Sequence, residues 1–512
     1  MPTVPQKAVD KKEEAVLMTD KNRGDTLMQS NSSKVLANFF WRFAERCGAQ
    51  GVTFIVSIVL ARLLDPSVYG TVALVTIFTT ILQVFVDSGM GNALIQKKDA
   101  DDLDFSSVFY FNMAVCSVLY LLIFLAAPLI AYFYEMPELT PVIRVLSLII
   151  LISGVKNIQQ AYVSRHMLFK CFFFSTLGGT IGAAVVGIVM AYNGFGVWAL
   201  VAQMLFNAAV DTTILWITVK WRPKKMFSLS RLKGLFSYGW KLLISALIDT
   251  IYTDLRQLVI GKIYSKEELA HYNQGDKFPK LIVTNINSSI DSVLFPTMSK
   301  AQDDVSLVKS MTRRSIKTST YIMMPLMVGL AVCAGPIVSL VLTDKWLPCV
   351  PFLRIFCFSY AFYPIHTANL NAIKAMGRSD LFLKLEIAKK TVGIIALLST
   401  MWISPLAMAY SMLVTSVLNQ IINSLPNRKL MNYSYLEQLR DMFPQICLSL
   451  FMGAVVFSIQ YIGLSAAVTL LLRVPVGFAV YILGSKLFHI DSFEYIISTV
   501  KGLFRKHKKK EV

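Results

Sequence analysis

Long apolar stretches, separated by short polar or charged segments, run through almost the whole chain. A helix that crosses a membrane needs roughly 20 mostly apolar residues, because the hydrocarbon layer is about 30 Å thick and offers the backbone no hydrogen-bond partner. Stretches of about this length fall at residues 38–62, 68–88, 106–132, 141–163, 171–192, 196–219, 235–260, 270–296, 318–342, 350–373, 382–403, 405–425, 442–462 and 465–485. We therefore predict an all-α membrane protein with about fourteen transmembrane helices.

The stretch at 270–296, AHYNQGDKFPKLIVTNINSSIDSVLFP, is the least apolar of these, and hydropathy alone would miss it. The pattern of basic residues in the loops nevertheless predicts that this stretch crosses the membrane. One set of loops is rich in lysine and arginine, including Lys97, Lys98, Arg165, Lys170, Lys220, Arg222, Lys224, Lys225, Arg231, Lys233, Lys300, Lys309, Arg313, Arg314, Lys317, Lys374, Arg378, Lys384, Lys389, Lys390, Arg428, Lys429 and Arg440. The opposite set holds only Arg62, Lys262, Lys266 and Lys345.

This asymmetry follows the positive-inside rule, and it stays in phase only if the chain crosses the membrane between Lys266 and Lys300. The sequence thus predicts a multi-pass plasma-membrane protein with both termini in the cytoplasm. Residues 1–35 read as a disordered cytoplasmic tail without the apolar core of a signal peptide. Residues 486–512 form a basic tail that is either an amphipathic helix at the inner leaflet or a solvated segment.

The chain also contains a weak internal repeat. ARLLDPSV at 61–68 is echoed by GKIYSKEEL at 261–269, Pro128 by Pro336, and the P-x-x-R of Pro141 by that of Pro351. The order is kept in both halves, which indicates two six-helix lobes, 36–233 and 234–425, followed by two further transmembrane helices in 426–485. Because six is even, both lobes enter the membrane from the same side, as a parallel repeat with the transport site between them.

Composition excludes several classes of protein. With 55% hydrophobic and only 16% charged residues, and a mean hydropathy of +0.56, the chain is not a soluble multi-domain protein. The net charge of +19 does not indicate nucleic-acid binding, because the basic residues fall in alternate loops. The seven cysteines are scattered and show no CxxC spacing, so we predict neither a disulfide framework nor a metal site, and no cofactor.

Charged residues inside the predicted helices are the candidate functional residues, because each costs roughly 2.5 to 3.5 kcal/mol at the helix centre unless a cavity or a partner compensates it. In the first helix Arg42, Glu45 and Arg46 share one face. They form either a cationic cavity wall or a group that reaches back to the lipid headgroups.

The seventh predicted helix carries a polar stripe made of Lys241, Ser245, Asp249, Tyr252, Thr253 and Arg256. The alternative to a transport role is internal neutralisation, since Asp249 and Thr253 are i,i+4 neighbours and Asp254 could pair with Arg256. The eighth helix carries Asn273, Asp276, Lys277, Lys280, Thr284, Asn287 and Asp291 along one face. A lipid-facing helix could not carry that face, and Gly275 and Pro279 within it predict a kink or local unwinding.

The tenth predicted helix has a milder stripe, which includes Tyr360 and Asn371 and fits helix–helix hydrogen bonding as well as a substrate path. Because the inward arginines and lysines outnumber the carboxylates, we expect an anionic ligand. A pyrophosphate fits, since guanidinium grips phosphate bidentately and ammonium acts as a point charge. The candidate substrate-binding residues are Arg42, Arg46, Lys241, Arg256, Lys277, Lys280, Asn287 and Asn371. The candidates for coupling transport to a proton or a sodium ion are Glu45, Asp249, Asp254, Asp276 and Asp291.

Four segments resemble the Wzx-type polysaccharide flippases, especially the colanic acid exporter branch of the multidrug/oligosaccharidyl-lipid/polysaccharide exporter superfamily. They are VLARLLDPSVYG, YNQGDKFPKL, LTDKWLPCVPFLRI and HTANLNAIKAMGRSDLFLKLEIAKK, and the similarity extends over residues 36 to about 485. The resemblance implies a fourteen-helix, two-lobed bundle in the bacterial inner membrane that moves undecaprenyl-pyrophosphate-linked oligosaccharide to the outer leaflet by alternating access. It also implies that a polysaccharide polymerase and glycosyltransferases act with it.

Two rival functions are less compatible with the residues. A multidrug or cation antiporter of the same superfamily would need a carboxylate-rich cavity, which the lysine and arginine excess disfavours. A membrane glycosyltransferase or polymerase would need acidic or histidine residues on a sizeable outer loop, but the predicted outer loops are short and the five histidines are dispersed without HExxH. We therefore predict a transporter rather than an enzyme.

Overall fold

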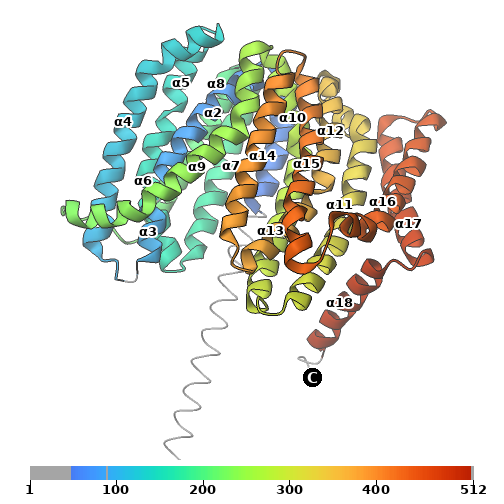
Figure 1. The fold of residues 1–512 in the computed structure, drawn as a ribbon. Helices are drawn as coiled ribbons and strands as arrows, with labels where there is room; N and C mark the ends of the chain where they lie inside the picture. The colour runs from blue at the N-terminus through green and yellow to red at the C-terminus, as the bar shows by residue number, and fades with distance from the viewer. Residues whose placement is uncertain (1–47, 88–89, 98, 509–512) are drawn as a thin grey trace, which may run out of the picture. The chain divides into compact units, whose positions relative to one another are not determined.

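The computed structural model describes residues 48–87, 90–97 and 99–508, and every regular element in these ranges is a helix. The first helix covers Gly48–Leu63. It is followed by α2 (Pro66–Asp87), α3 (Met90–Gln96), α4 (Asp102–Tyr134), α5 (Leu139–Leu146), α6 (Leu148–Arg165), α7 (Phe169–Tyr192), α8 (Val197–Thr218) and α9 (Leu229–Ile263). Then come α10 (Lys266–Lys300), α11 (Val305–Leu342), the 3-10 helix η1 (Asp344–Cys349), α12 (Val350–Ala361), α13 (Tyr363–Ala375), α14 (Ser379–Thr400), α15 (Pro405–Met431), α16 (Tyr435–Ser458), the 3-10 helix η2 (Ile459–Ile462), α17 (Ala466–Leu487) and α18 (Asp491–Lys508) (Figure 1).

The predicted all-α membrane architecture is confirmed. In the described part of the chain, ten helices or helix pairs are long and apolar enough to cross a membrane. The other predicted crossings correspond to the 48–63 helix, which is short as described, and to α9, α10 and α14, which are 35, 35 and 22 residues long but carry many charges. The number fourteen therefore stays a prediction, while these charged helices are long enough to span.

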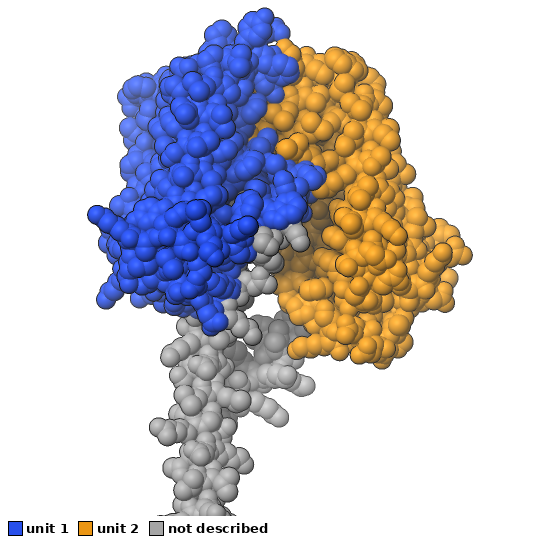
Figure 2. Space-filling model, turned by 60° about the vertical axis from the view of Figure 1, so that its left-hand side comes forward, with its two compact units in different colours: residues 1–60, 78–250 blue, residues 61–77, 251–512 orange. Residues whose placement is uncertain are grey.

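The chain divides into two compact units, which Figure 2 colours separately. Unit 1 comprises residues 1–60 and 78–250, and unit 2 comprises 61–77 and 251–512. Two long helices, α2 and α9, each begin in one unit and end in the other. The short segment 61–77 thus packs with residues far later in the sequence.

Close helix contacts and an ion pair between α6 and α8 help to hold unit 1 together. Glycines on α7 let α8 approach closely, since a Cβ added at Gly179 would lie 2.8 Å from Asn207 Oδ1 and one at Gly182 would lie 2.8 Å from Phe206. Lys156 Nζ on α6 lies 2.8 Å from Asp211 Oδ2 on α8, and both side chains are largely buried. Lys156, which stood out in the sequence as a lone charge, is therefore paired within unit 1.

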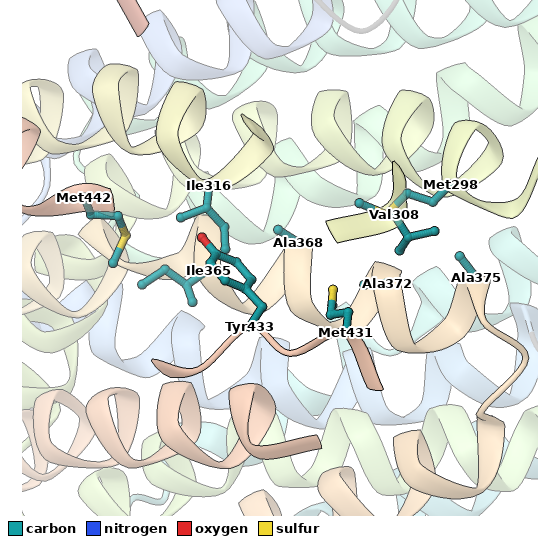
Figure 3. Close-up of a cluster of buried hydrophobic side chains, with 10 residues drawn as sticks. All are labelled: Met298, Val308, Ile316, Ile365, Ala368, Ala372, Ala375, Met431, Tyr433 and Met442. Carbon is teal, nitrogen blue, oxygen red and sulfur yellow. The ribbon is translucent and has the colours of Figure 1, made fainter. Parts of the chain in front are cut away.

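Unit 2 has an apolar core that packs α10, α11, α13, α15 and α16 against one another. Figure 3 shows this cluster, which comprises Met298, Val308, Ile316, Ile365, Ala368, Ala372, Ala375, Met431, Tyr433 and Met442. Four of its members come from α13, whose apolar face has period 3 to 4 along the helix. The same face of α13 continues into buried amides, where Asn369 exchanges hydrogen bonds with Gln438 and accepts from Asn427 at 2.6 Å.

The arginines of the two P-x-x-R motifs make similar contacts, one in each unit, while the predicted repeat itself stays a prediction. Arg144 Nε on α5 donates to the carbonyl of Phe124 on α4 at 3.2 Å. Arg354 Nε on α12 donates to the carbonyl of Ala331 on α11 at 3.3 Å. In both units a short helix that carries the P-x-x-R motif precedes a second helix, α5 before α6 and α12 before α13. Both break a predicted transmembrane stretch in two.

Candidate functional site

The polar stripe predicted at 270–296 lies on α10, which is one uninterrupted helix. Ser265 caps its start by accepting a hydrogen bond from the Glu268 amide at 3.1 Å, and Glu267 and Glu268 in the first turn favour the positive end of the helix dipole. The predicted local unwinding does not form, and the alternative prediction of a kink stays a prediction. Gly275 serves close packing instead, since a Cβ there would lie 2.7 Å from Phe352 Cβ and 2.9 Å from the Leu353 amide on α12.

Asp276 is fixed by two neighbours in unit 2. The Tyr360 hydroxyl, at the end of α12, donates a 2.6 Å hydrogen bond to Asp276 Oδ1. On the other oxygen, Lys280 Nζ lies 3.5 Å from Asp276 Oδ2, one turn further along α10. The carboxylate is mostly buried, with 18% of its side chain exposed, whereas 55% of the Lys280 side chain is exposed. The Lys280 ammonium thus contacts Asp276 on one side and, being on an exposed side chain, keeps other donors available.

A second carboxylate on the same helix is anchored from α13. Asn371 Nδ2 donates to Asp291 Oδ1 at 2.6 Å. Asn287 lies one turn before Asp291 and is buried, and its Oδ1 has no hydrogen-bond partner among the described residues. Two residues of the predicted tenth crossing, Tyr360 and Asn371, therefore donate hydrogen bonds to carboxylates of the predicted eighth. This is the helix–helix hydrogen bonding that was one interpretation of the stripe, and the other interpretation, a substrate path, stays a prediction.

The cations Arg256 and Lys277 lack such partners. Arg256 lies on the part of α9 that belongs to unit 2, and its Nε and Nη2 atoms are buried without a hydrogen-bond partner among residues 48–87, 90–97 and 99–508. Lys277, on α10, is likewise paired with no carboxylate within those ranges. The nearby Asp254 does not form an ion pair with Arg256. Its Oδ1 accepts a hydrogen bond from Gln257 Nε2 at 3.2 Å, and the cation that interacts with its charge is Lys280. Internal neutralisation of Arg256 by Asp254 is therefore not what forms.

The arrangement suits an anion. A buried guanidinium with unused donors costs several kcal/mol unless a ligand, water or ion completes it. Phosphate oxygens complement it, because they accept in the bidentate geometry that guanidinium offers. Asp276 and Asp291 keep their negative charge when Tyr360 and Asn371 donate to them. The donors left for an anion are therefore those of Arg256, whose Nε and Nη2 atoms have no partner among the described residues, and of Lys277.

Other predicted site residues are placed less fully. Asp249 is exposed on α9, in unit 1. Lys241 lies on the same helix, but its side chain is outside what the structure describes, and Arg42, Glu45 and Arg46 lie outside the described residues altogether. Within the described ranges, no group of three or more histidine, cysteine or carboxylate side chains could hold a metal ion.

The sequence reasoning missed several polar residues that the fold brings together. On α14, Lys389 Nζ lies 2.6 Å from Glu386 Oε1, and the ammonium of Lys390 lies 5.6 Å from the centre of the Tyr252 ring. The amides of Gln420, Asn423 and Asn427 are buried on α15, where Asn423 bonds the His366 ring at 2.9 Å. Their spacing of three and four residues within an apolar helix was the signal that could have identified them.

Comparison with known proteins places these observations in a family. The family described as "Polysaccharide biosynthesis protein" matches residues 59–351, which is more than half of the chain. The chain belongs to this family. The matched range includes the end of α9, which carries Arg256, and all of α10, which carries Asp276, Lys277 and Lys280. It ends at the start of α12, before Tyr360.

Curated relatives of this polysaccharide biosynthesis protein carry transport and biosynthesis names. The succinoglycan biosynthesis transport protein ExoT of Rhizobium meliloti (strain 1021) is 25% identical over 68% of this chain and 70% of its own length. The teichuronic acid biosynthesis protein TuaB of Bacillus subtilis (strain 168) is 28% identical over 59% of this chain and 63% of its own. The lipopolysaccharide biosynthesis protein WzxC of Escherichia coli (strain K12) is 23% identical over 73% of this chain and 76% of its own.

Solved structures share the fold. The lipid II flippase MurJ in an inward closed conformation superposes with a TM-score of 0.70, covering 90% of this chain and 99% of MurJ at 16% identity. An inward-facing multidrug resistance MATE family transporter of the MOP superfamily superposes with a TM-score of 0.60, covering 77% of this chain and 99% of the transporter at 14% identity. This polysaccharide biosynthesis protein is thus a multi-pass membrane protein with the fold of these transporters.

Proposed function

We propose that this chain is a flippase that moves a lipid-linked saccharide, carried on undecaprenyl pyrophosphate, from the inner to the outer leaflet of a bacterial plasma membrane by alternating access. Both termini then lie in the cytoplasm, and the product feeds polysaccharide assembly at the cell surface. A polymerase and glycosyltransferases are the expected functional neighbours, because a flipped repeat must be made before transport and joined after it.

One observation carries the proposal more than any other. Arg256 and Lys277 lie on helices long enough to span the membrane, and neither has a carboxylate partner in the described residues. Charges at that depth persist where a cavity and a ligand repay their desolvation. A diphosphate supplies a negative group for each of these two cations, while Asn287 offers an unused acceptor for a saccharide hydroxyl.

The rival functions explain the same residues less well. A drug antiporter that carries organic cations would be opposed by an uncompensated arginine and lysine, so it has no use for this pair. Most enzymes that hydrolyse a glycosidic bond use two carboxylates placed for acid and base roles on either side of it. Asp276 and Asp291 are each held by a donor from a neighbouring helix, Tyr360 and Asn371, which favours a role in positioning the α10 face.

Export in living cells tests the proposal. Arg256→Ala and Lys277→Ala should each reduce surface polysaccharide at least about tenfold at unchanged protein level, because each removes a charged hydrogen-bond donor to phosphate. Arg354→Ala is the matched control, since Arg354 also lies in unit 2 but already bonds the Ala331 carbonyl. Normal export from both site variants would refute the assignment, as would an equal loss in the control.

A further inference from the structure

Two helix ends meet within unit 2, although they come from distant parts of the chain. The first is the end of the 48–63 helix together with the loop that leads into α2, and the second is the end of α11 with η1. The last carbonyls of a helix have no partner inside it, and the partial negative charges of two helix ends repel each other. Basic side chains from each segment satisfy the carbonyls of the other.

The exchange is reciprocal. Arg62 Nε donates to the Val341 carbonyl at 2.8 Å, and Arg62 Nη2 donates to the Leu340 carbonyl, both at the end of α11. In return, Lys345 Nζ donates to the Leu64 carbonyl at 2.7 Å and to the Arg62 carbonyl at 3.0 Å. Asp65 Oδ1 lies 3.7 Å from the same ammonium. Each helix end thus provides the cation that caps the other.

Trp346 packs between these two helix ends. Its side chain is fully buried, and its indole Nε1 donates to the Ala61 carbonyl at 2.8 Å. Tyr69 on α2 packs edge-on against the indole with ring centres 5.3 Å apart, and His271 on α10 approaches from another side at 6.0 Å. The indole is thus enclosed by the starts of α2 and α10, while the Arg62 and Lys345 hydrogen bonds lie closer to the surface.

Basic residues are scarce in the loops that are assigned to the outer face, where this junction lies. The loops assigned to the outer face contain only four basic residues, Arg62, Lys262, Lys266 and Lys345, and two of the four form the exchange. A segment of the first predicted lobe, 61–77, is held by it within unit 2. The exchange thus holds a segment of the first predicted lobe against α11 and η1.

We propose that the reciprocal exchange between Arg62 and Lys345, closed by Trp346, is a latch that keeps the outer face shut and opens once per transport cycle. The inference rests on the proposed function and on the orientation given above. Polar contacts to exposed carbonyls suit a latch, because water replaces them at small net cost when they part, whereas a purely apolar seal would resist opening.

Cysteine labelling from outside the cell tests the latch without measuring transport. Leu64 is buried at the junction, so Leu64→Cys should react slowly with a membrane-impermeant maleimide in the latched protein. Asp65, whose side chain is 79% exposed, provides the reference: Asp65→Cys should be labelled from outside in every background. The parent chain with its native cysteines gives the background signal.

Adding Arg62→Met or Lys345→Met to Leu64→Cys should raise its labelling rate about tenfold, because each substitution removes charged hydrogen bonds from the closed state only. Arg354→Met is the matched control, since Arg354 Nε also donates to a carbonyl of α11 but takes no part in the junction. Trp346→Phe, which removes only the indole donor and part of the ring, should act in the same direction with a smaller rise.

Unchanged labelling in both latch variants would overturn the inference, as would an equal rise in the Arg354→Met background. Labelling of Asp65→Cys from the cytoplasmic side alone would also overturn it. Should Leu64→Cys fail to accumulate, Thr71→Cys, likewise buried on α2, serves as the second reporter. A failure of the proposed function would be seen in a different experiment. Polysaccharide export from Arg256→Ala would then be normal, while Arg62→Met and Lys345→Met would still raise the labelling of Leu64→Cys.

Discussion

The hydroxyl of Tyr360 donates a 2.6 Å hydrogen bond to Asp276, which joins the end of α12 to the charged face of α10. A carboxylate held in this way cannot turn to neutralise Lys277 one residue later, because consecutive side chains on a helix point about 100° apart. The bond therefore keeps a negative charge in place and leaves a neighbouring positive charge for a ligand. Asn371 holds Asp291 in the same manner further along the helix.

We propose Asp276 as the group that couples transport to an ion. Its two oxygens contact Tyr360 and Lys280, so loss or gain of its charge would change the availability of the Lys280 ammonium. We predict that Asp276→Asn changes the pH or sodium dependence of lipid flipping by the reconstituted protein. Asp380→Asn, at an exposed carboxylate of the same unit, is the control and should leave that dependence unaltered. An unaltered dependence in Asp276→Asn would clear Asp276 of the coupling role.

Gly275 should be intolerant of a side chain. Gly275→Ala places a Cβ 2.7 Å from Phe352 Cβ and 2.9 Å from the Leu353 amide, and overpacking of this kind costs about 1 to 3 kcal/mol. The variant should lose heat stability, measured as the temperature at which the detergent-solubilised protein aggregates. Gly329→Ala, in open space on α11, should instead be neutral or stabilising, because alanine favours the helix. Equal behaviour of the two variants would contradict the packing of α10 against α12.

The ion pair between Lys156 and Asp211 should show the asymmetry of buried pairs. Lys156→Met alone leaves Asp211 with 14% of its side chain exposed and no counter-charge from α6, which should destabilise unit 1 by about 3 kcal/mol. Lys156→Met combined with Asp211→Leu should recover much of this loss, since no charge is then left buried. Thermal unfolding of the single and double variants measures the difference, and additive losses would argue against the pair.

The start of α4 should respond to acid through its capping carboxylate. Asp101 Oδ1 accepts from the Asp104 amide at 3.0 Å, and this hydrogen bond, followed by the nearby Arg231, lowers the pKa of Asp101 below 3.8. A lowered pKa in the folded state stabilises the protein at pH values above about 4 and ceases to do so as the pH falls through the folded pKa. Asp101→Ala should cost about 1 kcal/mol at neutral pH and reduce the loss of stability on acidification. Asp101→Asn should retain most of the cap at neutral pH. A full acid response in Asp101→Ala would exclude this role.

Much of the fold followed from the pattern of apolar residues and loop charges. The helix at α10 was predictable despite its polar face, because the basic residues on either side required a crossing there. The internal repeat stays a prediction, but the arginines three residues after Pro141 and Pro351 both donate to a carbonyl of the preceding long helix. These features depend on period and topology, which a sequence displays directly.

The pairings within the site were not predictable. Tyr360 and Asp276 are 84 residues apart, and nothing in either helix indicates which rotation brings them together. The effect of Gly275 was misjudged for a related reason, since a glycine in a helix signals either flexibility or close packing and only the neighbouring α12 decides between them. The Arg62–Lys345 exchange escaped notice because it depends on carbonyls, which every residue has.

The affinity of the purified protein for a synthetic undecaprenyl-pyrophosphate saccharide, measured in lipid nanodiscs, tests the central claim most directly. If Arg256 and Lys277 receive the diphosphate, the double variant Arg256→Gln/Lys277→Met should bind at least about tenfold more weakly, and its binding should depend less on salt than that of the unaltered protein. Arg354→Gln should bind normally. Equal affinity and equal salt dependence in the double variant and the unaltered protein would contradict the account.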